Sequence, residues 1–174
     1  MVDGNRWPSP QYSVCFAPVD GDMSRFVHNF RELNVYKLAK ELSHEIFQLT
    51  KSFPKEETYS LTDQIRRSSR SVGAQIAEAW GKRRYERHFI SKLTDADAEQ
   101  LETQHWLETA HDCGYVSSKQ TDQLLQQYQS IGRMLGSMIS KSSMFCHQDT
   151  KMFSEPSPEY NVETQKIDFA TGDN

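Results

Sequence analysis

Hydrophobic residues between residues 30 and 145 recur at the three- and four-residue spacing that is typical of amphipathic helices. The first series is Leu33, Tyr36, Leu38, Ala39, Leu42, Ile46 and Leu49. The helix that it predicts ends before Pro54, because a residue that precedes proline is disfavoured in the α region. The second series is Leu61, Ile65, Ser68, Val72, Ile76 and Ala79, with Ser60 or Thr62 as a candidate N-terminal cap.

Two further series follow along the chain. The third is Phe89, Ile90, Leu93, Leu101, Leu107 and Ala110. Gly114 comes after it and is the residue type expected at a left-handed helix C-terminus. The fourth is Leu124, Tyr128, Ile131, Leu135 and Met138, which alternate in steps of fours and threes. Ser117 and Gln120 precede it with the spacing of a capping box.

Four helices joined by short connections predict an all-α fold, an antiparallel up-and-down four-helix bundle, because short loops place consecutive helices side by side. The bundle is expected over residues 30–145. Residues 1–29 hold prolines and glycines without a helical period and predict an irregular N-terminal arm. Residues 146–174 are acidic and also lack a period, which predicts a mostly disordered tail.

The composition agrees with a small protein outside the membrane. Hydrophobic residues make up 36% of the 174 residues, and no apolar run is long enough to span a bilayer. The three cysteines, Cys15, Cys113 and Cys146, have no metal-ligand or disulfide-framework spacing. Together with the lack of an export signal, this predicts a cytoplasmic protein with reduced thiols and no membrane partner.

Charge is distributed unevenly along a chain whose net charge is −4. Residues 61–87 carry seven basic and three acidic side chains, whereas residues 88–114 carry one basic and six acidic side chains. The seven basic residues are candidates for nucleic-acid binding, since arginines repeated along a helix can hold successive phosphates. They are Arg66, Arg67, Arg70, Lys82, Arg83, Arg84 and Arg87. The alternative is pairing with the acidic third helix, in the same or an adjacent subunit, through Asp95, Asp97, Glu99, Glu102 and Asp112.

Catalytic and metal-binding patterns give no support for an enzyme. Two Glu-x-x-His pairs, Glu41 with His44 and Glu102 with His105, have the spacing found in di-iron bundles. At about 100° per residue, however, both pairs point away from the apolar stripes of their helices. No nucleophile elbow or glycine-rich phosphate loop occurs. We therefore expect no enzymatic activity, no cofactor and no metal.

Three aromatic residues indicate a subunit contact. Trp106 lies about 130° from the centre of the apolar stripe of its helix, so one bundle does not readily bury it. Large aromatic side chains outside the core face are typical of interfaces. Trp80, Trp106 and Tyr115 are therefore the candidate interface residues of a homo-oligomer.

The sequence QIRRSSRSVGAQIAEAWGKRRYE, from Gln64 to Glu86, resembles a family of four-helix-bundle proteins. So do FPKEETYSL before it and FISKLTDADAEQLETQHWLETAHDCGYV after it. The family includes the proteins encoded in 23S ribosomal RNA intervening sequences and the accessory variability determinants of diversity-generating retroelements. The resemblance extends from Phe30 to Ile139.

The resemblance implies a non-enzymatic bundle that assembles as a ring-like homopentamer with a basic surface. In the retroelement branch it also implies binding to a reverse transcriptase and to nucleic acid, RNA or DNA. Arg66, Arg67 and Arg70 match the family's basic run, while Gln75 stands where asparagine is common and Ala79 where glycine is common. The acidic net charge of this chain favours the intervening-sequence branch, because the retroelement accessory proteins are strongly basic.

Two functional hypotheses follow from these observations. The first is a non-enzymatic oligomeric bundle that binds nucleic acid, or an enzyme acting on it, through the basic surface of the second helix. The alternative is a structural or regulatory homo-oligomeric scaffold that does not bind nucleic acid.

Overall fold

Residues 27–146 are described by the structure, a computed structural model in which four long helices account for most of the chain. They are α1 (Asn34–Leu49), α2 (Leu61–Gly81), α3 (Glu86–Asp112) and α4 (Ser118–Ser140). Four short 3-10 helices flank or connect them: η1 (Phe30–Glu32), η2 (Thr50–Ser52), η3 (Lys55–Glu57) and η4 (Ser142–Met144). No strand occurs in residues 27–146, which confirms the predicted all-α class.

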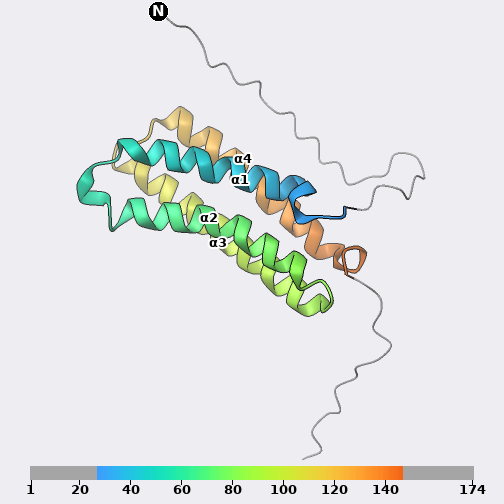
Figure 1. The fold of residues 1–174 in the computed structure, drawn as a ribbon. Helices are drawn as coiled ribbons and strands as arrows, with labels where there is room; N and C mark the ends of the chain where they lie inside the picture. Colours follow the sequence, from blue (N-terminus) through green and yellow to red (C-terminus); the bar gives the residue numbers. More distant parts are fainter. Residues whose placement is uncertain (1–26, 147–174) are drawn as a thin grey trace, which may run out of the picture.

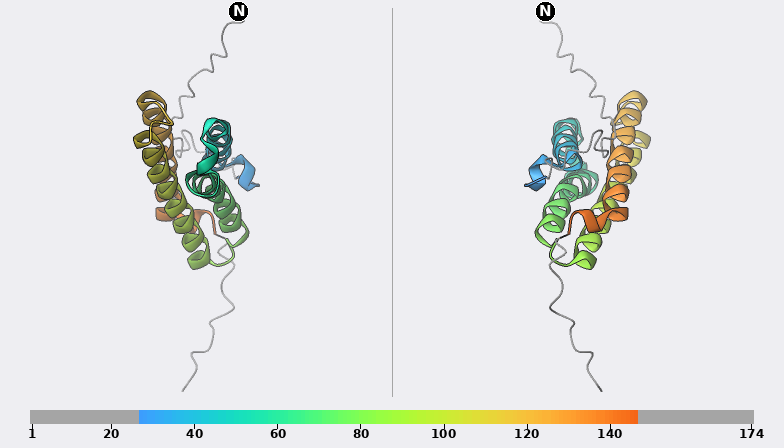
Figure 2. Two further views of the ribbon diagram at one scale, coloured as in Figure 1. Left: turned by 90° about the vertical axis from the view of Figure 1, so that its left-hand side faces the viewer. Right: turned by 90° about the vertical axis from the view of Figure 1, so that its right-hand side faces the viewer.

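The helices run up and down along one common direction (Figure 1). Contacts are made between α1 and α2, α2 and α3, α3 and α4, and α4 and α1, with the α2–α3 pair the most extensive. Figure 2 shows the same bundle from its two ends, with α1 beside α2 and α3 beside α4. The described chain begins and ends near the α2–α3 turn, while the α1–α2 and α3–α4 connections lie at the opposite end (Figure 1).

The core is continuous along the bundle and follows the predicted stripes closely on α4. Every member of the predicted α4 series is buried, and so is Thr121 one step before it. On α1 the buried side chains include Val35, which the predicted series omitted, whereas Tyr36 and Leu49 are only half-buried. A smaller apolar cluster closes the end of the bundle below the α1–α2 connection and consists of Phe53, Leu61, Ala110 and Val116.

The prediction for α3 is wrong at Leu101, which is 56% exposed. The buried positions of this helix step by fours and threes: Phe89, Leu93, Ala96, Gln100, Thr103, Leu107 and Ala110. Two of them are polar and satisfied locally, because Gln100 Nε2 donates to Asp97 Oδ1 at 3.0 Å and Thr103 Oγ1 lies 2.9 Å from Ser68 Oγ on α2. The repeat therefore passes through polar residues that a search for hydrophobic side chains does not select.

Helix ends follow the predicted signals in two of three cases. Gly114 has φ 76° and ends α3 in a Schellman arrangement, in which Tyr115 N donates to Ala110 O at 2.9 Å. Gln120 N donates to Ser117 Oγ at 3.4 Å, so Ser117 caps α4 as predicted. At α2, neither candidate cap acts in this way: Ser60 Oγ donates to the Glu57 carboxylate, and the hydroxyl of Thr62 is buried without a partner in residues 27–146.

Alanine at Gly114 is expected to lower the free energy of unfolding by about 1–2 kcal/mol, because a Cβ is unfavourable in the left-handed region. The added Cβ meets no atom within 4 Å, so the effect comes from the backbone alone. Urea unfolding monitored by circular dichroism measures it. Gly136, inside α4 and equally open, is the matched control, where alanine is expected to raise stability by about 0.5–1 kcal/mol. Equal effects at the two sites would contradict this expectation.

The predicted irregular arm over residues 1–29 and the predicted disordered tail over residues 146–174 lie almost wholly outside the described residues. Among the helices of residues 27–146, none combines the length and apolar character needed to cross a membrane.

Candidate nucleic-acid interface

The seven predicted basic residues do not form one continuous surface. Arg66 and Arg70 face α1, where they meet Lys51 around the ring of Phe47, and we refer to these four residues as the Phe47 cluster. Lys82, Arg83, Arg84 and Arg87 lie at the α2–α3 turn and are called the turn cluster. Arg67 belongs to neither cluster and lies near Glu99 of α3, whose pKa it lowers against the larger raising effect of burial.

Three cationic groups surround the half-buried ring of Phe47. Their distances from the ring centre are 4.9 Å for Lys51 Nζ, 5.1 Å for Arg66 Cζ and 5.8 Å for Arg70 Cζ. Contacts of this kind contribute about 0.5–1 kcal/mol each at exposed sites, and they hold like charges close together. The cluster therefore concentrates positive charge at one place on the α1–α2 face.

A buried threonine orients Arg66. Its Nε donates to Thr50 Oγ1 at 2.7 Å, and Thr50 is only 3% exposed. The Thr50 hydroxyl in turn donates to the carbonyl oxygen of Ile46 at 2.8 Å. Because this bond uses only Nε, the two terminal nitrogens of the guanidinium keep their donors for another acceptor.

An open groove between α1 and α2 continues from the Phe47 cluster toward η1. Its lining includes the aromatic rings of Phe30 and Tyr36, the small residues Gly73, Ala74 and Ala77, and the polar side chains of Lys40, Ser43 and Arg70. No carboxylate lines it. The positive character of the cluster thus extends along the groove through Lys40.

None of the seven basic residues forms an ion pair with a carboxylate in residues 27–146. The acidic side chains of α3 have other partners: Asp97 accepts from Gln100, and Glu102 accepts from Trp106 Nε1 at 3.0 Å. Within one subunit, the alternative of arginines paired with α3 is therefore limited to the proximity of Arg67 and Glu99.

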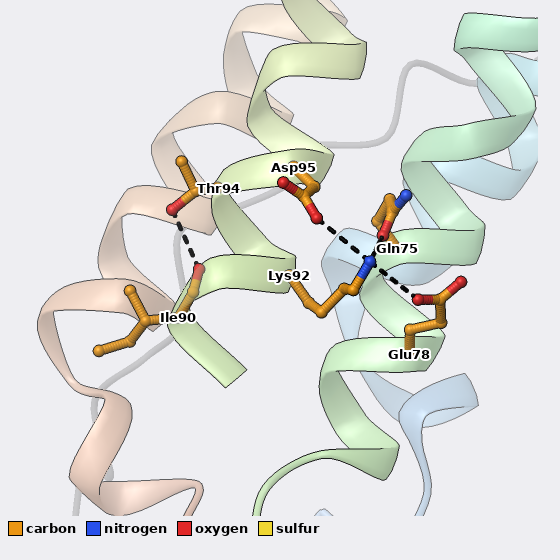
Figure 3. Close-up of polar contacts among 6 residues, drawn as sticks. All are labelled: Gln75, Glu78, Ile90, Lys92, Thr94 and Asp95. Atoms are coloured by element: carbon orange, nitrogen blue, oxygen red, sulfur yellow. Dashed lines mark hydrogen bonds and ion pairs between the residues drawn. The ribbon is translucent and has the colours of Figure 1, made fainter. Parts of the chain in front are cut away.

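Lys92 makes the ion pairs that link α2 to α3 (Figure 3). Its Nζ lies 3.0 Å from Glu78 Oε2 and 3.2 Å from Asp95 Oδ2, and it donates to Gln75 Oε1 at 3.0 Å. The hydrogen bonds to Glu78 and Asp95 raise the pKa of Lys92. The lone basic residue of the acidic segment 88–114 thus takes the position across α2 that the arginines were weighed for.

The turn cluster is anchored on aromatic rings. Arg83 Cζ lies 3.4 Å from the ring centre of Trp80, and Arg83 Nε donates to the Trp80 carbonyl oxygen at 2.8 Å. Partial burial lowers the pKa of Arg83. Arg84 Cζ lies 5.9 Å from the ring centre of Tyr85, and Lys82, Arg84 and Arg87 are exposed.

The three candidate interface aromatics lie at different ends of the bundle. Trp80 is 9% exposed and packs in the core near the α2–α3 turn, under Arg83. Trp106 is half-buried at the other end and packs against both apolar clusters. Tyr115 lies at that same end, where its hydroxyl donates to Glu57 Oε1 at 3.2 Å and burial raises its pKa. Only Trp106 and Tyr115 therefore keep a substantial exposed area on a shared end.

The Glu-x-x-His pairs lie as predicted. Glu41, His44, Glu102 and His105 are all exposed. No group of three or more histidine, cysteine, aspartate or glutamate side chains suited to a metal ion occurs in residues 27–146.

Three residues of the Phe47 cluster could not be selected from the basic pattern of the second helix. Lys51, Phe47 and Thr50 belong to the end of α1 and to η2, where nothing in the local sequence links them to Arg66. The signal that could have found them is the phase of α1, since Ser43, Phe47 and Lys51 recur every four residues beside the buried stripe.

The matched family agrees with the observed fold. The family model of the 23S rRNA-intervening sequence proteins matches residues 31–137, which is more than half of the chain. The chain belongs to this family. The resemblance read from the residues around α2 is thereby confirmed, and the match covers all of α1, α2 and α3 and most of α4.

A solved member of related sequence supports the assignment to the 23S rRNA-intervening sequence family. It is the crystal structure of a protein with unknown function from the S23 ribosomal protein family of Bacteroides thetaiotaomicron, which is 31% identical to this chain. The superposition has a TM-score of 0.56 and covers 61% of this chain and 95% of that one. No match was found among curated proteins. Neither the family description nor that of the solved protein names an enzymatic activity.

Proposed function

We propose that this protein is a non-enzymatic, homo-oligomeric member of the 23S rRNA-intervening sequence family that binds RNA through the basic residues of α2. The observation that carries the proposal is the Phe47 cluster. Three cations stand around one ring, and none of the three is ion-paired with a carboxylate in the described part of the chain.

The chemistry of these groups favours a phosphate ligand. A guanidinium presents a planar fork of donors that matches phosphate oxygens, and Arg66 is held in place by Thr50 before any ligand arrives. Mutual repulsion among the three cations is relieved when an anion binds between them. RNA supplies such anions at regular intervals, and the family's name, which refers to an intervening sequence of 23S rRNA, supports RNA as the polyanion.

Self-association is the second part of the proposal. Leu101 and Trp106 leave apolar area open on α3, and Tyr115 adds to it at the same end of the bundle as Trp106. The resemblance to ring-forming relatives makes a homopentamer the expected assembly. Sedimentation of the full chain measures its mass, and a monomer at all concentrations would contradict this part.

The salt dependence of RNA binding tests the RNA part. If the full chain neutralises three phosphates of a single-stranded RNA, the logarithm of the binding constant is expected to fall linearly with the logarithm of salt concentration, with a slope of about −2. Fluorescence anisotropy with a labelled RNA between about 0.05 and 0.3 M salt measures the slope. An absence of binding at the lowest salt, or binding that does not respond to salt, would contradict the proposal.

A further inference from the structure

The described chain ends beside the turn cluster. Ser142 Oγ donates to Glu86 Oε1 at 2.6 Å, and the ring of Phe145 stacks on Phe89 with their centres 5.8 Å apart. Cys146, the last described residue, lies close enough to Arg83 for each to shift the pKa of the other. These contacts hold residues 142–146 at the α2–α3 end of the bundle, where the chain continues as residues 147–174.

The segment that continues from this point is strongly acidic. Residues 148–174 contain six acidic and two basic side chains. The first of the acids, Asp149, is three residues beyond Cys146, so its Cα lies no more than about 11 Å from that of Cys146, whatever the conformation. The segment at the other end of the chain, residues 1–26, carries three acidic and two basic side chains and is nearly neutral.

The turn cluster offers this segment a complementary surface. Lys82, Arg84 and Arg87 are exposed, and none of them is ion-paired with a carboxylate in residues 27–146. The neighbouring acids are engaged: Glu78 holds Lys92, and Glu86 accepts from Ser142. Arg83 is fixed on Trp80 and adds a fourth positive charge at the point where the chain leaves the bundle.

We propose that the acidic segment 148–174 binds the turn cluster of its own chain. A short tether gives the acids an effective concentration in the millimolar range at the cluster, so that individually weak charge contacts suffice for binding. The turn cluster is then covered by an internal polyanion, whereas the Phe47 cluster, at the other end of α2, stays open to external ligands. This inference does not depend on RNA binding.

Trypsin cleavage after Lys151 tests the proposal on the full chain. In low salt, cleavage is expected to be several-fold slower in the wild type than in the variant Lys82→Gln, Arg84→Gln, Arg87→Gln. The difference is expected to vanish at about 0.5 M salt, where charges are screened within a few ångströms. Cleavage after Arg25 provides an internal reference, because it lies in the nearly neutral segment.

A charge-matched control separates the turn cluster from net charge. The variant Lys37→Gln, Lys119→Gln, Arg133→Gln removes three exposed cations outside the cluster and is expected to leave cleavage after Lys151 slow. Equal cleavage in the wild type and the turn variant at low salt would overturn the proposal. Protection that grows with protein concentration would also overturn it, because the segment would then bind a second copy.

A second measurement does not depend on the turn variant. Amide substitution of the six acids in residues 148–174 is expected to move the backbone NMR signals of residues 82–87, and high salt is expected to move the wild-type signals in the same direction. Unchanged signals would overturn the proposal. Because RNA is absent from both experiments, their failure would leave the proposed RNA binding untouched.

Discussion

Replacement of Arg66 and Arg70 together by glutamate is expected to weaken RNA binding on the order of 100-fold or more at about 0.1 M salt. Hydrogen bonds to charged groups contribute about 1.5–3 kcal/mol each, and every 1.4 kcal/mol is a factor of ten in affinity. The two arginines lie on either side of Phe47, so both phosphate contacts are lost and the new carboxylates repel the backbone. The salt slope is expected to fall by about one for each contact.

The matched control reverses the same number of charges on α4. The variant Lys119→Glu, Arg133→Glu changes the net charge equally and is expected to retain binding within a few-fold, since both side chains are exposed outside the α1–α2 face. Circular dichroism and sedimentation of both variants show whether fold and assembly persist. An equal loss in the two variants would contradict a local site.

The same pair of variants also tests the scaffold alternative. If the arginines of α2 only connect to the acidic α3 of an adjacent subunit, the Arg66 and Arg70 reversal dissociates the oligomer. If they bind RNA, the oligomer persists while affinity falls. Sedimentation distinguishes the two results directly, because the former changes the mass and the latter does not.

Alanine at Leu107 is expected to lower the free energy of unfolding by about 2–5 kcal/mol. Leu107 is 0% exposed and occupies a core position of α3, so its removal loses buried apolar area and leaves a cavity. Urea unfolding measures the effect as a lower midpoint with an unchanged slope. A loss of this size is a large fraction of the stability of an ordinary domain.

Leu101 on the same helix is the control. It is 56% exposed, and alanine there is expected to change stability by less than about 0.5 kcal/mol. The pair has the same chemistry and the same helix, so the difference isolates burial. If Leu101→Ala cost as much as Leu107→Ala, then Leu101 would be buried in solution, by the bundle core or by a partner subunit.

The fold was accessible from the sequence where the helical signals are local. The α4 series was complete, and Gly114 and Ser117 end and begin their helices as predicted, because capping depends on residues within one turn of the helix end. On α3 the central core positions are Gln100 and Thr103, whose burial depends on partners. Thr103 is satisfied in part by Ser68, 35 residues earlier in the chain, and no local pattern reports such a partner.

The candidate site was only partly accessible in the same way. The basic residues of α2 were visible as a group, but their division into two clusters depends on what packs beside each turn of the helix. Arg66 and Arg70 meet Phe47 of α1, whereas Arg83 covers Trp80 of its own helix. Trp80 was predicted at an interface by its size and setting, yet most of its surface is buried within the bundle.

The spacing of apolar residues alone determined that four amphipathic helices form, because each helix must bury its apolar face and short connections leave antiparallel packing as the outcome. The run of basic residues also placed positive charge on α2. The surroundings of each charge were decided only by the packing of α1 and α3 against α2, which places Lys51, Phe47 and Thr50 beside Arg66 and gives Glu78 to Lys92. Electrostatic contacts depend on distance in space, and distance between side chains on different helices is a property of the assembled bundle.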